Sequence, residues 1–247
     1  MRNRFKIILT FLYAIITISC VSINETNKSA STIVPSITNS TLPIAKTINY
    51  LALGDSYTIG QSVCNTCSYP EQLKQNLSNI YPATSFSLKT IAKTGWTTSN
   101  LLSAIKADNL SSNYDLVTLL IGVNNQFQNL FFSVYEKEFP ELVNRATFLA
   151  KGNKSNVVVL SIPDYAYTPF GQSSTFNHKT ISSEIDKYNA FAENFCKTNN
   201  IKFISITDIT RQGLSNPSLV TQDGLHPSQT AYTLFVERIL PKVKLTI

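Results

Sequence analysis

Five short apolar runs alternate with longer amphipathic segments along most of this chain, and that alternation limits the fold more than any other feature. The runs lie at residues 50–53, 86–91, 116–121, 157–162 and 202–206. The segments at 70–79, 99–106, 135–150, 181–198 and 227–240 have the apolar spacing or end signals of helices. Strands that alternate with helices over short connections usually pair in parallel, so the sequence predicts α/β layers around a mainly parallel sheet.

The size of the chain favours one domain. At 247 residues, of which 43% are hydrophobic, it can bury one sizeable core but not two large ones. The formal net charge is +6, yet Arg2, Arg4 and Lys6 precede an apolar run that looks removable. A chain that begins at Cys20 keeps 18 basic and 15 acidic residues, or +3. Such a mild and scattered charge gives no reason to expect a nucleic-acid partner.

The N-terminus has the pattern of a targeting segment. A basic start is followed by an almost wholly apolar stretch at 7–18 and then by Ser19 and Cys20. The stretch is shorter than the roughly 20 residues of a spanning helix, which favours a removable signal over residues 1–19. A cysteine at this place resembles a bacterial lipoprotein signal, in which Cys20 carries the lipid, although Thr17 stands where leucine is usual. Simple secretion is the alternative.

Residues 20–46 shift to serine, threonine and asparagine and show no helical or alternating period. A segment of this kind cannot bury enough apolar surface to offset its ordering entropy, so we expect a disordered tether. The folded domain is then residues 47–247. This organisation predicts an exported protein held on a bacterial membrane through Cys20, in the periplasm or at the cell surface, or otherwise secreted.

Two motifs supply the groups of a nucleophilic serine site. Ser56 follows the first apolar run, and Asp223 stands three residues before His226, one of only two histidines. A serine hydroxyl needs a base to take its proton and a third group to orient that base. The alternative is structural, because Gly54 and Asp55 are also typical of a turn, and His226 with Pro227 is typical of a helix start.

Two further residues could stabilise an oxyanion. Gly95 follows the second apolar run and Asn124 follows the third, so both are expected at the sheet edge that also receives Ser56. A glycine backbone N–H, an asparagine amide and the N–H of Ser56 are suitable donors to a tetrahedral intermediate. Taken singly, Gly95 and Asn124 are as typical of ordinary loops.

The four blocks together resemble the SGNH or GDSL-type hydrolase family over about residues 50–240. They read Gly54-Asp55-Ser56-Tyr57-Thr58, then Gly95, then Gly122-Val123-Asn124, then Asp223-Gly224-Leu225-His226-Pro227. The resemblance implies a three-layer α/β/α sandwich with a flavodoxin-like, five-stranded, mainly parallel sheet. It implies that Ser56 is the nucleophile, His226 the general base and acid, and Asp223 its partner. Ser56, Gly95 and Asn124 would form the oxyanion hole, and no cofactor or metal would take part.

The chain departs from the family pattern at two positions. Tyr57 replaces the leucine of the family name, which should not affect the chemistry because this side chain carries no proton in the reaction. Asn125 stands where an acidic residue is usual. That residue is generally supportive in the family, so the change concerns the geometry of the loop more than activity.

The cysteines indicate a disulfide rather than a metal site. Cys64 and Cys67 have the spacing of a zinc or redox pair, but a second ligand pair is absent and the chain has two histidines. In an exported protein this spacing favours a local disulfide in the loop after Ser56, with Cys196 as a buried thiol on a helix.

Two aromatic loops could shape a substrate pocket. One is 126–135, with Phe127, Phe131 and Phe132, and the other is 163–178, with Tyr165, Tyr167, Phe170 and Phe176. These rings could line a pocket for an acyl chain or a sugar, or simply fill space beneath the loops. His178 is expected to be an ordinary loop residue.

The sequence therefore predicts a metal-independent ester hydrolase that acts on a small-molecule, lipid or glycan ester. Two alternatives remain open. One is a catalytically silent surface protein that binds glycans or lipids in the same cleft, and the other is an acyltransferase that uses the same triad.

Overall fold

The structure is a computed structural model that describes residues 46–173, 175 and 177–245. The predicted signal peptide at 1–19 and nearly all of the predicted tether at 20–46 lie outside the described residues. At the centre is a five-stranded sheet in the order β2-β1-β3-β4-β5. The strands are β1 (Thr47–Gly54), β2 (Ser85–Ala92), β3 (Leu116–Leu120), β4 (Val157–Leu160) and β5 (Lys202–Ile204).

All four strand pairs are parallel, which confirms the predicted sheet. Strand β1 pairs with β2 along its whole length, from Thr47 opposite Ser85 to Gly54 opposite Ala92. Its other side pairs with β3, where Gly54 lies opposite Leu120. The strand order reverses between β1 and β3, and in open parallel sheets ligands bind at the carboxyl ends of the strands beside such a point.

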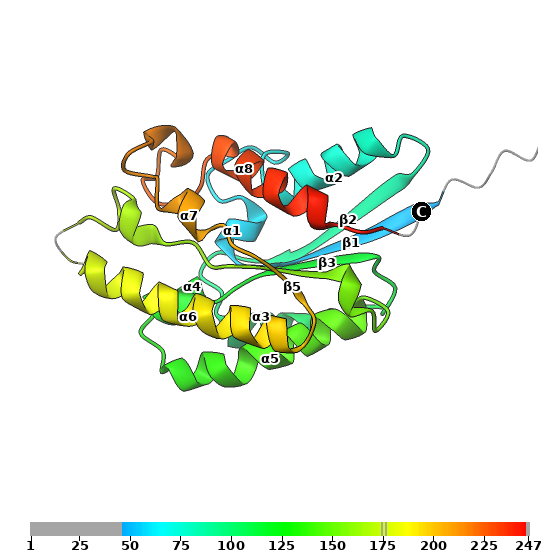
Figure 1. Cartoon of the computed structure of the whole chain (residues 1–247), viewed down its shortest axis with the longest axis horizontal. Coiled ribbons are helices and arrows are strands. Elements are labelled where there is room, and N and C mark those ends of the chain that lie inside the picture. The colour runs from blue at the N-terminus through cyan, green and yellow to red at the C-terminus, as the bar shows by residue number, and fades with distance from the viewer. Residues whose placement is uncertain (1–45, 174, 176, 246–247) are drawn as a thin grey trace, which may run out of the picture. The chain divides into compact units, whose positions relative to one another are not determined.

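Helices cover both faces of the sheet and complete the predicted three layers (Figure 1). One face carries α1 (Ser56–Ile59), α2 (Tyr69–Ile80), α7 (Thr207–Thr210) and α8 (Gln229–Ile239). The other carries α3 (Thr98–Ala107), α4 (Val123–Phe127), α5 (Phe132–Leu149) and α6 (His178–Thr198). Short 3-10 turns lie at Lys154–Asn156, Tyr165–Tyr167, Pro217–Leu219 and Leu240–Lys242.

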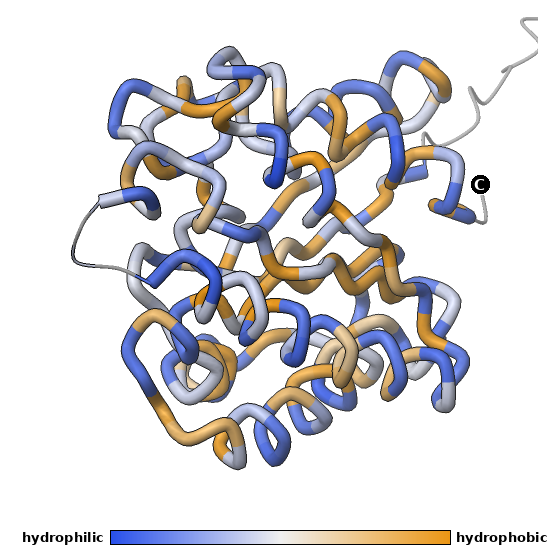
Figure 2. Tube along the Cα trace, turned by 60° about the vertical axis from the view of Figure 1, so that its left-hand side comes forward, coloured by the Kyte–Doolittle hydropathy of each residue, from blue (hydrophilic) through white to orange (hydrophobic). Residues whose placement is uncertain are grey.

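The core explains why the central strands read as continuous apolar runs. Every residue of β3 and β4 is buried, because helices cover the sheet on both faces. Figure 2 shows hydrophobic residues concentrated along the central strands, with hydrophilic residues on the outer turns of the helices. The β2 strand lies at an edge of the sheet, and accordingly all of its residues except Ile91 are exposed or half-buried.

The structure adds elements that the sequence pattern does not predict. The helices α1, α4 and α7 span only four or five residues, which is too short to show a helical period. His178, expected in a loop, is the first residue of α6, and Asn177 caps that helix by accepting a hydrogen bond from the backbone N–H of Thr180. Among the described residues, no helix has the length and apolar character needed to cross a membrane.

Candidate active site

Ser56 is held in a tight turn directly after β1. Asp55 caps helix α1, since its Oδ1 accepts a hydrogen bond from the backbone N–H of Tyr57 at 3.0 Å. Gly54 permits this turn, because a Cβ there would lie 2.0 Å from Thr58 Oγ1 and 2.4 Å from the backbone oxygen of Leu120. As the first residue of α1, Ser56 has a backbone N–H without an intrahelical partner.

The loop before α8 holds Asp223 against His226. The Oδ2 atom of Asp223 lies 2.7 Å from the Nδ1 atom of His226. Its Oδ1 atom also accepts the backbone N–H groups of Leu225, at 2.8 Å, and His226, at 2.9 Å. The carboxylate therefore fixes both the ring and the backbone of His226 and favours the tautomer with hydrogen on Nδ1, which leaves Nε2 available as a base.

Two hydroxyl groups, one local and one from a distant loop, support the same carboxylate. Ser62 Oγ donates to Asp223 Oδ2 at 2.6 Å, and Thr221 Oγ1 donates to Asp223 Oδ1 at 2.7 Å. Burial alone would raise the pKa of Asp223, but the hydrogen bonds from Ser62, Thr221 and His226 outweigh it and hold that pKa well below its usual range. Asp223 is thus an anion throughout the neutral range.

A cavity of about 170 Å³ brings four of the predicted site residues together. Ser56, Gly95, Asn124 and His226 all line it, although they come from four separate loops. Asp223 lies behind His226, in contact with its ring nitrogen. No hydrogen bond between Ser56 Oγ and the ring of His226 is present in the described residues, and in ligand-free sites such bonds are often long.

The predicted oxyanion donors have distinct surroundings. Gly95 has a positive φ of 80°, and its carbonyl accepts a hydrogen bond from Gln128 Nε2 at 2.8 Å, which fixes the peptide. The Asn124 amide donates to the backbone oxygen of Trp96 at 3.0 Å. Its second hydrogen bond, to Asp55 Oδ2, is long at 3.5 Å and therefore weak, so this is the donor that a ligand would take most easily.

Asp55 is a buried acid directly beside the serine. Its side chain is 0% exposed, and burial raises its pKa from 3.8 to about 7, against the opposing effect of its hydrogen bonds. The sequence did not single out Asp55 for this property, because burial depends on the packing of α1 over the sheet.

Asn125 supports the glycine loop. It is fully buried, its Oδ1 accepts the backbone N–H of Thr98 at 3.0 Å, and its Nδ2 donates to Thr98 Oγ1 at 2.6 Å. Asn125 therefore ties the start of α4 to the start of α3, directly after the loop that carries Gly95. An asparagine satisfies this place without the acidic group that the family pattern usually has.

Part of the predicted aromatic set lines the cavity. Phe127, Tyr165 and Phe170 form its apolar side together with Val123 and Leu225. The Phe127 ring lies 5.8 Å from that of Tyr165 and 6.1 Å from that of Phe170, so the three rings pack as one wall.

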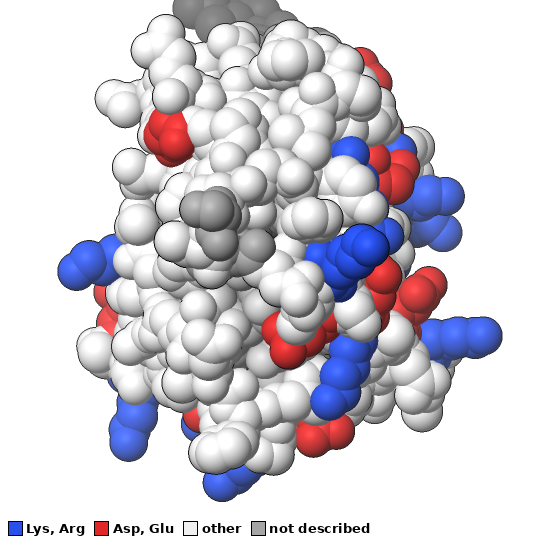
Figure 3. Space-filling model, turned by 90° about the vertical axis from the view of Figure 1, so that its left-hand side faces the viewer, with Lys and Arg blue, Asp and Glu red and all other residues white. Residues whose placement is uncertain are grey.

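The other predicted rings are not in the wall. Phe131 is 85% exposed, Phe132 packs edge-on against Tyr188, and Tyr167 lies beside Arg211. Phe176 lies outside the described residues. On the edge of the molecule that holds the site, uncharged side chains cover much of the visible surface, and many of the acidic and basic groups gather to the right of and below its centre (Figure 3).

The described part of the chain shows the bonding state of three cysteines. Cys64 and Cys67 form a disulfide, and Cys196 is a free, buried thiol. Burial raises the pKa of Cys196 to about 12, so it stays protonated and unreactive. Across residues 46–173, 175 and 177–245 no three His, Cys, Asp or Glu side chains are grouped as metal ligands.

Sequence reasoning did not find Ser62 and Thr221. Ser62 is 161 residues from Asp223 along the chain, and no local pattern connects them. Thr221 is two residues from Asp223, and its short spacing is the one local signal that could have indicated a contact.

Solved structures with the same fold include esterases. Axe2, an acetylxylan esterase from Geobacillus stearothermophilus, is 18% identical with a TM-score of 0.63, over 83% of this chain and 98% of that one. LAE5, an alpha/beta hydrolase enzyme from the metagenome of Lake Arreo, is 19% identical with a TM-score of 0.61, over 81% and 96%. A member of the lipolytic G-D-S-L family from Veillonella parvula is 16% identical with a TM-score of 0.61, over 78% and 97%.

The TM-scores and coverage of these structures show a shared fold. The family is shown by a match of the sequence itself. A search of curated protein sequences finds no match. The family model of the GDSL-like lipases and acylhydrolases matches residues 52–234, which is most of the chain and includes all four sequence blocks. The chain therefore belongs to the GDSL-like lipase/acylhydrolase family and is an ester-hydrolysing enzyme.

Proposed function

We propose that the enzyme cleaves esters through Ser56, His226 and Asp223. Ser56 Oγ attacks the ester carbonyl carbon while His226 Nε2 takes its proton, and the carbonyl oxygen becomes an oxyanion. The alcohol leaves with the proton returned by His226, and water then hydrolyses the acyl group from Ser56 by the same steps. The contact of 2.7 Å between Asp223 and His226, at a cavity that Ser56 also lines, is the observation that carries this proposal.

The oxyanion would be bound by three donors. The backbone N–H groups of Ser56 and Gly95 and the amide of Asn124 belong to residues around the same cavity. Donors held in place before the reaction stabilise the developing charge without a reorganisation cost, and one such donor contributes about 10²-fold or more to kcat.

Covalent labelling tests the nucleophile. We expect a fluorophosphonate to label the purified enzyme at Ser56 and to label neither Ser56→Ala nor His226→Ala. His178→Ala is the matched control, because it removes the other histidine from the exposed start of α6 and should leave labelling intact. Unchanged labelling of the Ser56→Ala variant would refute the assignment.

The shape of the cavity favours a short acyl group, with acetyl esters as the first candidates. The wall of Phe127, Tyr165 and Phe170 limits a cavity of only about 170 Å³. Acetylxylan esterases are among the structures with this fold, which supports acetyl esters of carbohydrates as substrates. A longer lysophospholipid acyl chain would need this wall to move.

A series of p-nitrophenyl esters measures the acyl preference. We expect kcat/KM to fall from acetyl and butyryl esters to octanoyl and longer ones. Phe127→Ala should raise the relative activity on the octanoyl ester, because it shortens the wall. Phe131→Ala, which changes an exposed phenylalanine of the same segment, should leave the preference unchanged. A preference for long chains in the unmodified enzyme would overturn the short-acyl proposal and leave the serine mechanism intact.

Analysis of the reaction products distinguishes hydrolysis of the ester from transfer of its acyl group. Free acid should be the main product in the presence of a xylo-oligosaccharide acceptor, whereas an acylated sugar would make the enzyme an acyltransferase.

We also propose that the enzyme is exported, with residues 1–19 removed and Cys20 lipidated. The apolar stretch that ends in Ser19 and Cys20 supports this proposal. Mass analysis of the membrane-extracted protein should find acyl groups on an N-terminal Cys20 and none in a Cys20→Ser variant. An intact start at Met1, or a cleaved but unacylated chain, would contradict it.

A further inference from the structure

Lysines gather at the edge of the sheet opposite the cavity. The strands are parallel, and the helices that connect them run in the opposite direction. This edge therefore contains the first residues of the strands and the last turns of the helices. Nine lysines belong to these ends or pair with residues there: Lys46, Lys89, Lys106, Lys151, Lys154, Lys197, Lys202, Lys242 and Lys244. We call this set the basic edge.

The basic edge has few opposing charges. The acidic residues in its loops are Asp108 and Asp115, which form ion pairs of 2.6 Å with Lys89 and Lys151. The last turn of α8 adds Glu237 and Arg238, whose charges cancel. The formal excess at the edge is therefore seven positive charges, whereas the rest of residues 46–245 has seven basic and eleven acidic residues. The basic edge therefore carries a net positive charge, and the rest of the described domain, including the site, carries a net negative charge.

Helix stability explains only part of this pattern. Lys106 and Lys197 lie in the last turns of α3 and α6, where a cation is favourable. Lys202 and Lys244 are outside helices, and they repel each other: burial and then the charge of Lys244 lower the pKa of Lys202. Repulsion between like charges does not stabilise the fold, so it is consistent with a role in binding.

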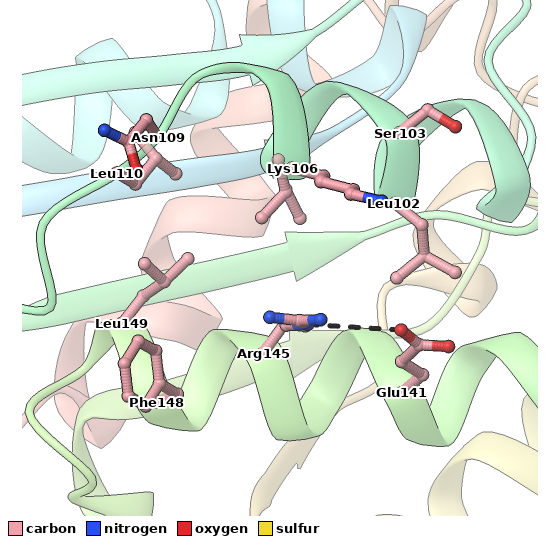
Figure 4. A pocket seen from close by; sticks show the side chains of 10 residues that line it. Leu102, Ser103, Lys106, Asn109, Leu110, Glu141, Arg145, Phe148 and Leu149 are labelled. Atoms are coloured by element: carbon pink, nitrogen blue, oxygen red, sulfur yellow. Dashed lines mark ion pairs between the residues drawn. The ribbon is translucent and has the colours of Figure 1, made fainter.

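A groove of about 350 Å³ opens beside the basic edge, between the C-terminal halves of α3 and α5. Figure 4 shows Leu102 on α3 and Arg145 on α5 pointing into the space between the two helices, with Phe148 at the end of α5. Phe148 is 61% exposed. The groove thus combines apolar side chains with the cations Lys106 and Arg145, of which Arg145 pairs loosely with Glu141 at 4.0 Å.

We propose that the basic edge, with its groove, docks on the surface of an anionic lipid bilayer. Clustered lysines complement anionic headgroups, and an exposed aromatic ring beside them fits the boundary between headgroups and acyl chains. Lys46 lies at this edge, so the 45 residues that precede it join the domain on the side that would face the lipid.

This docking fixes the direction of the active site. Ser56 follows the far end of β1, whose eight residues extend roughly 26 Å from the basic edge. The cavity would therefore open away from the lipid. At physiological ionic strength surface charge is screened over about 8 Å, so the cavity would also lie outside the electric field of the headgroups. The bound enzyme would act on esters that approach from the aqueous side.

Vesicle binding with charge-matched variants tests the proposal in the full chain. One variant replaces Lys106, Lys154, Lys197 and Lys244 with glutamine, and its control replaces Lys74, Lys137, Lys179 and Lys187. Both sets remove four positive charges, but only the first lies on the basic edge. Co-sedimentation is measured with vesicles of phosphatidylcholine alone and of equal parts phosphatidylcholine and phosphatidylglycerol.

The edge variant should lose affinity for the mixed vesicles by about fivefold per lysine, while the control keeps most of it. Neither should change binding to phosphatidylcholine alone, because the residues that precede Lys46 are the same in both chains. Equal losses in the two variants would overturn the proposal. So would edge-dependent binding to a soluble polyanion that anionic vesicles do not displace, because that result would identify a polymer as the partner.

A second pair of variants tests the orientation. Phe148→Ser at the groove should weaken binding to the mixed vesicles, and Phe131→Ser at the opposite edge should not, although Phe131 is the more exposed ring. The reverse result would place the active-site edge against the lipid and refute the docking proposed here. Activity on a soluble acetyl ester should be unchanged in Phe148→Ser.

Discussion

Ser62 shows how a residue far from the motifs can position the site. Its hydroxyl donates to Asp223 Oδ2, the same oxygen that meets the ring of His226. Ser62 itself has a positive φ of 67°, so its placement depends on the turn between α1 and the disulfide. It does not line the cavity. Ser62 is therefore a positioning residue that acts through Asp223.

Ser62→Ala should lower kcat by about tenfold or more and leave KM nearly unchanged. A hydrogen bond to a charged group typically contributes about 1.5–3 kcal/mol, about 1.4 kcal/mol is tenfold in rate, and the residues that line the cavity are intact. Steady-state kinetics on an acetyl ester would check this split. Ser103→Ala, whose hydroxyl donates within α3, is the control. A rise in KM with kcat unchanged would show that Ser62 contacts substrate instead.

Asp55 should make stability depend on pH. Its folded pKa is raised from 3.8 to about 7, so the folded state holds a proton that the unfolded state releases. The free energy of unfolding should fall as pH rises from about 4 to 7, by up to roughly 1.4 kcal/mol per pH unit. Asp223, whose pKa is lowered, has the opposite effect only at more acidic pH.

Urea unfolding across this pH range would measure the effect of Asp55. An Asp55→Asn variant should show a much flatter dependence, and an identical slope in both proteins would refute the role of Asp55. The amide keeps an acceptor for the N–H of Tyr57, so the cap itself is preserved.

At the level of elements, the strands and long helices follow from local periodicity, and the turns around the site follow from long-range packing. All five strands and all five longer helices were predicted from the sequence, with ends that differ by a few residues. The positions of Ser56, Gly95 and Asn124 directly after strands also predicted that they lie at one edge. The hydrogen bonds from Ser62 and from Asn125 could not be predicted, because they join segments that are distant in sequence.

Gly54→Ala should destabilise the turn between β1 and α1. The added methyl group would lie 2.4 Å from the backbone oxygen of Leu120, which cannot move away without breaking the pairing of β1 with β3. We expect a loss of about 3 kcal/mol, measured by urea unfolding. Adding Thr58→Ala should recover only part of it, and full recovery would show that Thr58 rather than Leu120 sets the limit.

For the whole molecule, the sheet and both helical layers share one hydrophobic core. A chain that starts at residue 46 should therefore unfold in a single transition and keep its esterase activity. Its unfolding enthalpy should be roughly 140 kcal/mol near 60 °C, equal by calorimetry and by van't Hoff analysis. Two separate transitions would contradict a single core.

We expect the disulfide between Cys64 and Cys67 to link the enzyme's activity to the redox state of its surroundings. It closes the loop directly after Ser62, the residue that holds Asp223 in place. In a reducing cytosol Cys64 and Cys67 would not be bonded and the loop would be less constrained. We therefore predict that a newly made chain has low activity and becomes fully active after export to an oxidising space. Cys64→Ser with Cys67→Ser should mimic the immature form, with lower kcat and a stability loss of about 2 kcal/mol. Full activity in that variant would show that the disulfide is dispensable. If the chain instead becomes active only after the disulfide forms, the cell's own esters would be protected from the enzyme while it is being made.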